Sequence, residues 1–287
     1  MKRFRILHRT YYNFSAPVTL GTHQLRLRPR ESHELRIEAS TLAIEPAASL
    51  RWLRDAENNS VAIASFSEPA QQLAIESDVI VQQWNVNPYN FLIDEDAAQW
   101  PFRYRAAETA ALMPYLQAAD AQADFQAVSR WLDDSSREAI AETFARLQAL
   151  NEKIRSGLSY RIRDEAGVQS PHDTLSLGSG ACRDFAALFI AAARQMGFAA
   201  RFVSGYLRAD AAIDNLGATH AWAEVYLPGA GWKGFDPTLA QLAGPDHFAV
   251  AVARTADAVP PISGAYTGNA TSRLEVGVWV TELPAPP

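Results

Sequence analysis

The sequence predicts an α+β protein, with an antiparallel β-sandwich at the N-terminus and a second, α+β part after it. Three observations predict this fold class. Short segments of alternating polar and apolar residues fill the first third of the chain, and a region with helical spacing of apolar residues follows. A glycine-rich stretch with the single cysteine then leads into a helix and a β-hairpin.

The N-terminal segments read as β-strands separated by turns. Gly21, Pro29, Pro46 and Pro69 are among the residues that separate them. Repeated short strands of this kind are typical of an antiparallel sandwich of roughly 100 residues. The predicted strands cover residues 4–12, 23–27, 35–44, 60–66 and 73–81.

A looser stretch after Trp84 is interpreted as a linker, and we predict an N-terminal β-sandwich domain with linker over 1–105 and a core domain over 106–287. The first predicted helix of the core follows Ser135 and Ser136. Its apolar residues recur at helical spacing, and it ends at Gly157. These apolar residues are Ile140, Phe144, Leu147 and Ile154.

Composition limits the function classes. The chain of 287 residues has one cysteine, so Cys182 is either an inert buried residue or a reactive thiol, and no clustered Cys/His pattern indicates zinc. The longest apolar run, 185–193, is too short to span a bilayer, and the N-terminus shows no signal-peptide core. We therefore expect a cytoplasmic protein. Residues 178–180 lack the lysine of a phosphate loop, and no cofactor or metal is predicted.

Residues 1–30 carry seven Lys and Arg and no acidic residue. Such a run can indicate an anionic partner. Here the arginines alternate with apolar residues, which favours solvated strand faces. We expect neither a nucleic-acid nor a membrane partner, because no basic helix or aromatic stacking platform accompanies the charge.

Cys182 is predicted to lie on the first turn of a buried helix. Glycines precede it, and a strongly helix-forming apolar run follows and ends at Gly197. The N-terminus of a helix presents unpaired N–H groups and a positive partial charge, which favour a thiolate and bind an oxyanion. Buried, inert cysteine is the alternative, since free cysteine is among the most often buried residues.

A β-hairpin is predicted from an alternating strand, 219–227, a Pro-Gly turn and a second strand that ends at Asp236. The register decides whether His220 and Asp236 meet. A four-residue loop would put them on opposite faces of the hairpin, whereas a three-residue loop that pairs Leu227 with Gly231 sets Asp236 opposite Trp222. We therefore predict the three-residue loop or an equivalent bulge.

Cys182, His220 and Asp236 then form a candidate catalytic triad. The thiolate is the nucleophile, the imidazole carries the proton, and the carboxylate orients the imidazole. The alternatives are a hydrogen-bonded core histidine for His220 and an Asp-Pro-Thr turn for Asp236. The coincidence of all three residues with a Gly-Cys helix start favours the triad.

Four sequence blocks resemble the bacterial transglutaminase-like cysteine peptidase superfamily. They are Gly180–Ala186, Arg201–Leu207, His220–Pro228 and Gly231–Thr238, and the segments 7–14 and 24–30 resemble the β-rich region found ahead of that core in bacterial members. The resemblance implies a papain-like core, with Cys182, His220 and Asp236 as the triad, and acyl transfer from protein or peptide amides through a thioester. Asp94, Glu95 and Asp96 are interpreted as part of a solvated linker, not as a calcium site.

Further residues near the triad have two interpretations each. Trp222 and Tyr160 are candidate second oxyanion donors, beside the backbone N–H of Cys182, but packing roles are the alternative. Glu224 either lines the cleft or is exposed, and His172 with Asp173 is either a second pair or part of a loop turn.

Sequence alone leaves the acyl acceptor and the oligomeric state open. Water as the acceptor gives a peptidase or amidase, which we favour, and an amine gives cross-linking. A catalytically silent binding module and N-acyl transfer from a thioester cofactor are the rival functions.

Overall fold

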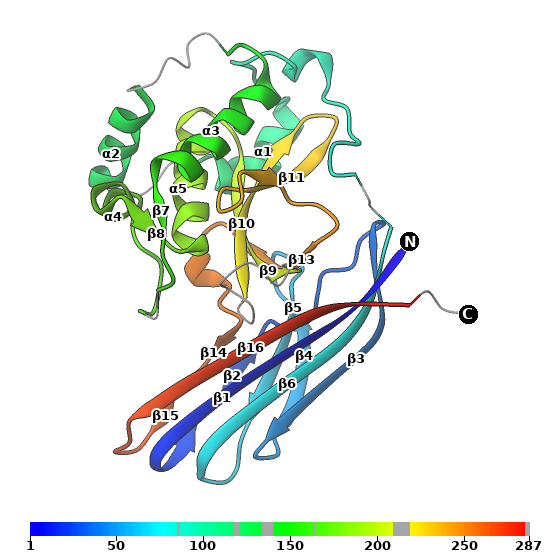
Figure 1. The fold of residues 1–287 in the computed structure, drawn as a ribbon, viewed down its shortest axis with the longest axis vertical. Helices are drawn as coiled ribbons and strands as arrows, with labels where there is room; N and C mark the ends of the chain where they lie inside the picture. Colours follow the sequence, from blue (N-terminus) through cyan, green and yellow to red (C-terminus); the bar gives the residue numbers. More distant parts are fainter. Residues whose placement is uncertain (85–86, 118–120, 134–139, 164, 209–218, 285–287) are drawn as a thin grey trace.

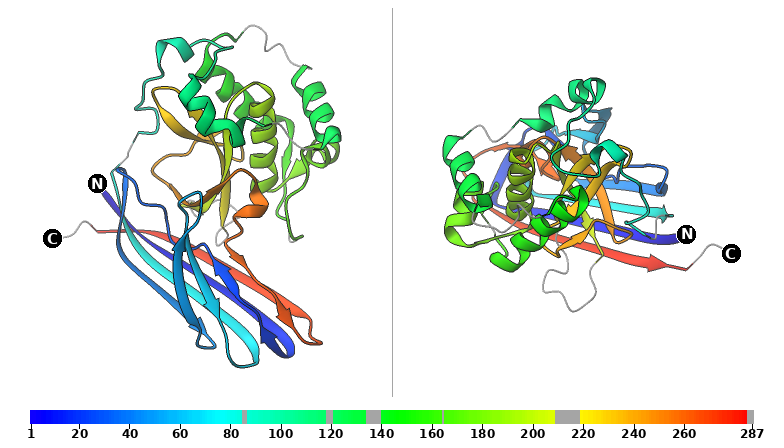
Figure 2. Two further views of the ribbon diagram at one scale, coloured as in Figure 1. Left: turned by 180° about the vertical axis from the view of Figure 1, so that it is seen from behind. Right: turned by 90° about the horizontal axis from the view of Figure 1, so that it is seen from above.

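The computed structural model describes residues 1–84, 87–117, 121–133, 140–163, 165–208 and 219–284. Its lower half in Figure 1 is built of long strands, and its upper half of helices around a smaller sheet. The rear and top views in Figure 2 show the same division, with the helices gathered on the side away from the long strands. The fold class is therefore the predicted α+β arrangement.

The lower half is a sandwich of two antiparallel sheets. The first has the order β15-β1-β6-β3, with β16 also paired to β1, and the second has the order β14-β2-β5-β4. Buried apolar residues of both sheets, such as Val18, Leu25 and Leu73, form the core between them. The strands are β1 (Lys2–Leu20), β2 (His23–Leu25), β3 (Leu35–Glu45), β4 (Ser49–Arg54), β5 (Ser60–Ser65), β6 (Ala70–Gln83), β14 (Ile262–Ser263), β15 (Tyr266–Thr267) and β16 (Ser272–Leu283).

All five predicted strands of this region are present, and β4 is an additional one. β4 escaped prediction because it is an exposed edge strand, and only Leu53 in it is even partly buried. Alternation of polar and apolar residues identifies a strand with one buried face, and β4 lacks such a face.

Basic residues of β1 pair with acids of the adjacent β6 and of β3, the strand beyond it. Arg3 contacts Glu38 at 2.6 Å, Arg5 contacts Asp78 at 2.6 Å, and Arg9 contacts Glu76 at 2.5 Å. Cross-strand pairs of opposite charge contribute modestly to sheet stability. They account for much of the positive charge at the N-terminus without an external partner.

The end of the chain returns to the sandwich. β16 pairs with β1 from Arg3↔Leu283 to Phe14↔Ser272, and β14 and β15 pair with β2 and β1. The expectation that the whole of 106–287 belongs to the second domain therefore does not hold for its last segment. The physical reason is that β1 has two edges, and β6 satisfies the hydrogen bonds of only one of them.

The upper half packs helices against a sheet of order β12-β11-β10-β9-β13. The central helix α5 is buried along most of its length among residues such as Ala223 and Phe235 of the sheet. The helices are α1 (Ala106–Leu116), α2 (Gln122–Asp133), α3 (Thr143–Gly157), α4 (Pro171–Leu177), α5 (Cys182–Gln195) and the short 3-10 helices η1 (Glu95–Ala97) and η3 (Ala256–Ala258). The strands are β7 (Ser159–Tyr160), β8 (Ser179–Gly180), β9 (Ala200–Leu207), β10 (His220–Leu227), β11 (Gly231–Asp236), β12 (Gln241–Leu242) and β13 (His247–Ala253).

The predicted helix that ends at Gly157 is α3, but it begins later than expected. Its first residue is Thr143, and the carboxylate of Glu142 caps it by accepting hydrogen bonds from two backbone N–H groups. Ile140 precedes the helix, and Ser135 and Ser136 lie outside the described residues. An uncommon cap, Glu in place of Ser or Asp, is why the start was misplaced.

The two halves share a buried apolar interface. Phe4 of β1 packs edge-on against Phe248 of β13, with ring centroids 5.1 Å apart. Ile6 and Val81 of the sandwich and Tyr206 of β9 belong to the same buried cluster. Strands β9 and β13 thus belong to the core sheet, and residues on one of their faces pack against the sandwich.

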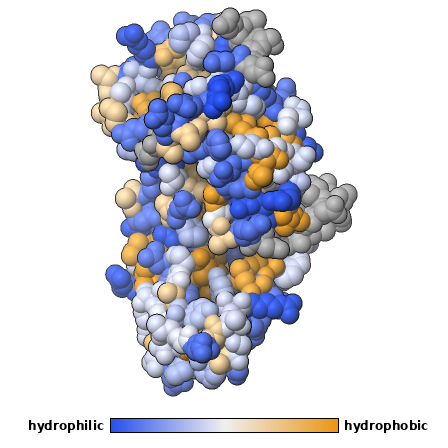
Figure 3. Space-filling view, turned by 90° about the vertical axis from the view of Figure 1, so that its left-hand side faces the viewer, coloured by the Kyte–Doolittle hydropathy of each residue, from blue (hydrophilic) through white to orange (hydrophobic). Residues whose placement is uncertain are grey.

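Among the described residues, no helix combines the length and hydrophobicity needed to cross a bilayer. On the face shown in Figure 3, hydrophobic residues gather in small groups separated by hydrophilic ones. A surface of this kind is ordinary for a folded protein, because apolar atoms always form a large share of it.

Candidate active site

Cys182 is the first residue of α5, as predicted, and its side chain is buried. The helix ends at Gln195, and Gly197 follows with a φ of 88°, a conformation that glycine adopts without strain. The first N–H groups of a helix have no acceptor within it. The N–H of Cys182 is one of these, so it makes no hydrogen bond within the helix.

Asp184 fixes the backbone around the cysteine. Its fully buried carboxylate accepts hydrogen bonds from the N–H of Ala181 at 2.8 Å and of Gln169 at 2.8 Å. It also pairs with the guanidinium of Arg163 at 2.9 Å. Three donors of this kind hold the segment before Cys182 and the loop at Gln169 in one arrangement. Neither Asp184 nor Arg163 was predicted from the sequence to have a role.

The hairpin has the predicted register. Leu227 pairs with Gly231, so the loop consists of residues 228–230, and Ala223 pairs with Phe235. Asp236 therefore lies one step beyond Phe235, on the face that also carries His220. The prediction of a three-residue loop is confirmed.

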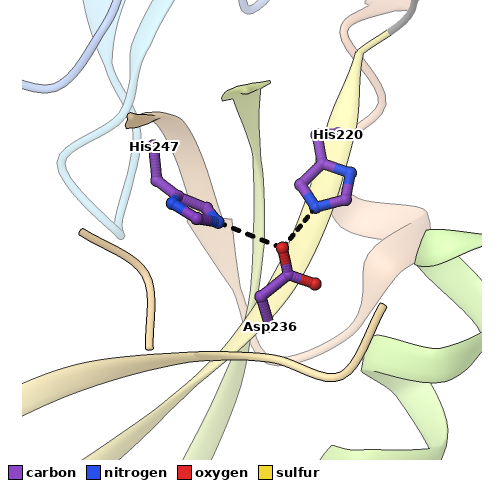
Figure 4. Close-up of side chains that lie close together, drawn as sticks. All are labelled: His220, Asp236 and His247. Atoms are coloured by element: carbon purple, nitrogen blue, oxygen red, sulfur yellow. Dashed lines mark hydrogen bonds and ion pairs between the residues drawn. The ribbon is translucent and has the colours of Figure 1, made fainter. Parts of the chain in front are cut away.

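His220 and Asp236 are hydrogen-bonded through His220 Nε2 and Asp236 Oδ2 at 2.7 Å (Figure 4). The second ring nitrogen of His220, Nδ1, points away from Asp236. Cys182 lies close enough to His220 to help raise the pKa of the imidazole. Because Nε2 is occupied, we assign the contact with Cys182 to Nδ1. The structure thus brings all three predicted residues together.

The charges of this group support one another. Burial favours the neutral form of His220, but the carboxylate of Asp236 and the contact with Cys182 outweigh it and raise the pKa of His220 above its ordinary value. Burial likewise opposes the charged form of Asp236, and His220 and His247 nevertheless hold the pKa of Asp236 well below its usual range. An imidazolium beside a carboxylate is therefore the favoured state of this pair.

His247 is a member of the cluster that sequence reasoning missed. Its Nε2 lies 3.0 Å from the same Oδ2 of Asp236, and the ligand atoms of His220, Asp236 and His247 all lie within 4.8 Å of one another. Three such side chains are also a possible metal-binding set. Its only signal in the sequence is a histidine directly before an apolar run, 248–253, which does not reveal which carboxylate it contacts.

Trp222 lies on the same face of β10 as His220, opposite to the face that carries Ala221 and Ala223. Its ring is buried with Val203 and Val252, 5.2 Å from the ring of His247 and 6.1 Å from that of His220. Ala221 and Ala223, its neighbours, belong instead to the cluster that contains Cys182. The position favours the packing role for Trp222 over the oxyanion role.

Tyr160 lies beside the helix start. It pairs with Gly180 through the short parallel sheet of β7 and β8, and its ring packs edge-on against Phe185, with centroids 6.2 Å apart. Of the two oxyanion candidates, Tyr160 is thus the one placed on the same side as Cys182.

The remaining polar residues take other roles. Glu224 is mostly buried and forms an ion pair with Arg201 at 2.8 Å. His172 and Asp173 lie in the first turn of α4, where a loop turn was expected, and Ser170 caps that helix. Both side chains are about half exposed. Asp94 and Asp96 pair with Arg105 at 3.0 and 3.7 Å.

Comparisons with known proteins identify the family of this chain. Residues 4–82 match the model of the bacterial transglutaminase-like N-terminal region, and residues 130–237 match that of the transglutaminase-like superfamily. The chain is 34% identical to an uncharacterised protein of Mycobacterium tuberculosis, over 97% of this chain and 92% of that protein. It is 28% identical to an uncharacterised protein of Mycobacterium leprae, over 99% of this chain and 100% of that protein.

A solved structure shares the fold of nearly the whole chain. A protein of Cytophaga hutchinsonii, described as a candidate cysteine protease, matches with a TM-score of 0.77 and 19% identity, over 99% of this chain and 92% of that one. The similarity extends across both the β-sandwich and the core. Together with the matched family models, it shows that this chain belongs to the bacterial transglutaminase-like superfamily, as a transglutaminase-like core preceded by the bacterial N-terminal β region.

Proposed function

We propose that this protein is a thiol-dependent amide hydrolase, a cysteine peptidase or amidase, with Cys182 as the nucleophile. One observation carries the proposal: the hydrogen bond from His220 to Asp236 leaves Nδ1 of His220 for Cys182 at the start of α5. An imidazolium close to a thiol favours the thiolate, and so does the positive partial charge at the N-terminus of a helix.

The proposed reaction has two steps. The Cys182 thiolate attacks the carbonyl carbon of the amide, and the backbone N–H of Cys182 donates to the oxyanion of the tetrahedral intermediate. The C–N bond breaks as His220 gives its proton to the departing amine, which leaves a thioester on Cys182. His220 then removes a proton from water, the hydroxide attacks the thioester, and the carboxylic acid leaves as the thiolate is restored.

Protein or peptide amides are the proposed substrates, with water as the acyl acceptor. Cytoplasmic location and independence of cofactors remain predictions. Transfer to an amine would use the same thioester, so the acceptor needs a direct test. Hydrolysis predicts release of free carboxylate from glutamine and peptide amides, without incorporation of a fluorescent primary amine.

The test follows alkylation of Cys182, the only thiol in the chain, against pH. We expect iodoacetamide to label native protein well below pH ~8.5, the ordinary pKa of a free thiol, and labelling to slow in His220→Ala. Cys182→Ala should fold and lose all amide turnover. A native thiol that resists labelling at every pH, and reacts only after unfolding, would favour a silent binding module instead.

A further inference from the structure

Asp236 accepts hydrogen bonds from two imidazoles on a single oxygen atom. His220 Nε2 lies 2.7 Å and His247 Nε2 3.0 Å from Oδ2 (Figure 4). The backbone N–H of Thr238 donates to Oδ1 at 2.9 Å. All three side chains are buried, and that of Asp236 is fully so. Only one of the two imidazoles, that of His220, also reaches Cys182.

The surroundings of His247 determine where its proton lies. The backbone N–H of Gly244 donates to Nδ1 of His247 at 3.2 Å, so Nδ1 carries a lone pair. In the neutral ring, Nε2 then carries the hydrogen and donates it to Asp236. His247 thus satisfies both of its ring nitrogens as a neutral donor to the carboxylate.

The same argument disfavours a metal ion at this cluster. A histidine that ligates a metal through Nε2 normally donates its Nδ1–H to a carbonyl or carboxylate. Nδ1 of His247 instead faces an N–H donor, which requires the proton on Nε2, where a metal would have to bind. Hydrogen bonds account for the positions of all three side chains.

His247 is itself held in place by its strand. It is the first residue of β13, which pairs with β9, and the next residue, Phe248, packs against Phe4 of the β-sandwich. Its ring lies edge-on to Trp222. The position of its Nε2 is therefore fixed by the docking of the sandwich on β13.

We propose that His247 is a positioning residue, which holds the carboxylate of Asp236 so that Nδ1 of His220 stays directed at Cys182. This inference rests on the proposed function and adds a fourth residue to it. A carboxylate bound by one imidazole alone can rotate about its χ2 angle, whereas one bound to His220, His247 and Thr238 has a single orientation. Precise orientation matters, because displacements near 1 Å in an active site cost large factors in rate.

The test compares two substitutions of His247 by alkylation of Cys182. His247→Leu keeps the approximate volume and removes the donor, while His247→Gln keeps an N–H donor near the position of Nε2. We expect His247→Leu to lower the iodoacetamide rate constant at pH 7 about tenfold, and to shift the labelling profile by about one pH unit toward that of a free thiol. His247→Gln should restore most of both.

His8→Leu is the matched control. His8 is also buried with both ring nitrogens bonded, but to Tyr206 and Thr10, outside the site. It should lower the melting temperature without moving the labelling profile. If His247→Leu also lowers the melting temperature without moving the labelling profile, His247 has a purely structural role and the proposal is overturned.

Two other outcomes separate the alternatives. If the wild-type thiol is labelled rapidly at low pH and His247→Leu has the same profile, the role of His247 is wrong and the proposed function stands. If the wild-type thiol resists labelling, the proposed function itself fails. Stoichiometric zinc in the purified wild-type protein that is lost in His247→Leu would make the cluster a metal site and overturn the positioning role.

Discussion

The side chain of Asn59 forms two hydrogen bonds with the backbone of Val252, across the interface between the sandwich and the core. Its Oδ1 accepts from the N–H of Val252 at 2.9 Å, and its Nδ2 donates to the carbonyl oxygen at 2.8 Å. Asn59 is fully buried at the turn between β4 and β5. It therefore binds the edge of β13, the strand that begins with His247, as an adjacent strand would.

Replacement of Asn59 by leucine should destabilise the protein by about 3 kcal/mol. The change leaves the N–H and C=O of Val252 buried without their partner, and each such group costs about 1–3 kcal/mol. Urea unfolding measures the loss, and Arg51→Ala, on exposed β4, is the control with an expected change within about 0.5 kcal/mol. An unfolding free energy equal to the wild type would mean that the apolar contacts alone dock the sandwich.

The buried His8 predicts a loss of stability in acid. Burial lowers its pKa from 6.5 to about 4, so the unfolded chain binds the proton more readily than the folded one. The contribution is fully present above pH 6.5 and is lost as the pH falls toward 4, by about 3 kcal/mol in total.

The measurement for His8 is the free energy of unfolding between pH 7 and 4, in wild type and His8→Leu. His8→Leu should be less stable at pH 7, and its stability should fall less steeply with acid. Parallel curves for the two proteins would contradict the assignment. Alkylation of Cys182 in both proteins at pH 7 shows whether the site stays intact.

The hairpin and the helix start were predictable because their signals are local. Alternation of side chains placed His220 and Asp236 on one face once the loop length was fixed, and a glycine stretch before an apolar run identified the start of α5 at Cys182. Leu227↔Gly231 pairing is the observed register. When two residues are within about twenty positions of each other and regular secondary structure connects them, few relative positions of their side chains are possible.

Other features depend on contacts between distant parts of the chain. β16 pairs with β1, although more than 250 residues separate the paired positions. The sequence of neither strand indicates which strand it pairs with. His247 of β13 contacts Asp236 of β11 although β10 and β9 lie between these strands in the sheet, and this contact has no local signal in the sequence. Trp222 was a candidate oxyanion donor or a packing residue, and the sequence did not tell which layer of the fold covers its side chain.

Removal of the carboxylate of Asp184 should destabilise the start of α5 strongly. Asp184→Ala leaves the largely buried guanidinium of Arg163 with only the exposed Glu165, at 3.5 Å, as an ionic partner, which costs about 3–5 kcal/mol, and it releases the N–H groups of Ala181 and Gln169. We expect a lower urea midpoint and slower alkylation of Cys182 at temperatures where the protein stays folded.

The double variant Asp184→Ala with Arg163→Met separates the two effects. It removes the buried charge that has lost its buried partner, so part of the stability should return, because loss of both partners costs less than loss of one. Alkylation of Cys182 should remain slow, since the backbone before Cys182 still lacks its acceptor. Recovery of both readouts would show that Asp184 acts only by neutralising Arg163.

Gly205 provides a test of the layer beneath the histidines. A Cβ atom there would overlap the carbonyl oxygen of Phe248 and lie 2.5 Å from Cη2 of Trp222, whose ring packs on His247. Gly205→Ala should cost about 1–3 kcal/mol by overpacking. It should also slow alkylation of Cys182, because Trp222, whose ring lies beside those of His220 and His247, has to shift.

Gly157→Ala is the matched control, because no atom lies within 4 Å of its added Cβ. At the end of α3, alanine should leave stability unchanged or raise it by up to about 1 kcal/mol. If Gly205→Ala lowers stability but leaves the alkylation profile intact, Trp222 supports the sheet without affecting how His247 and Asp236 are held.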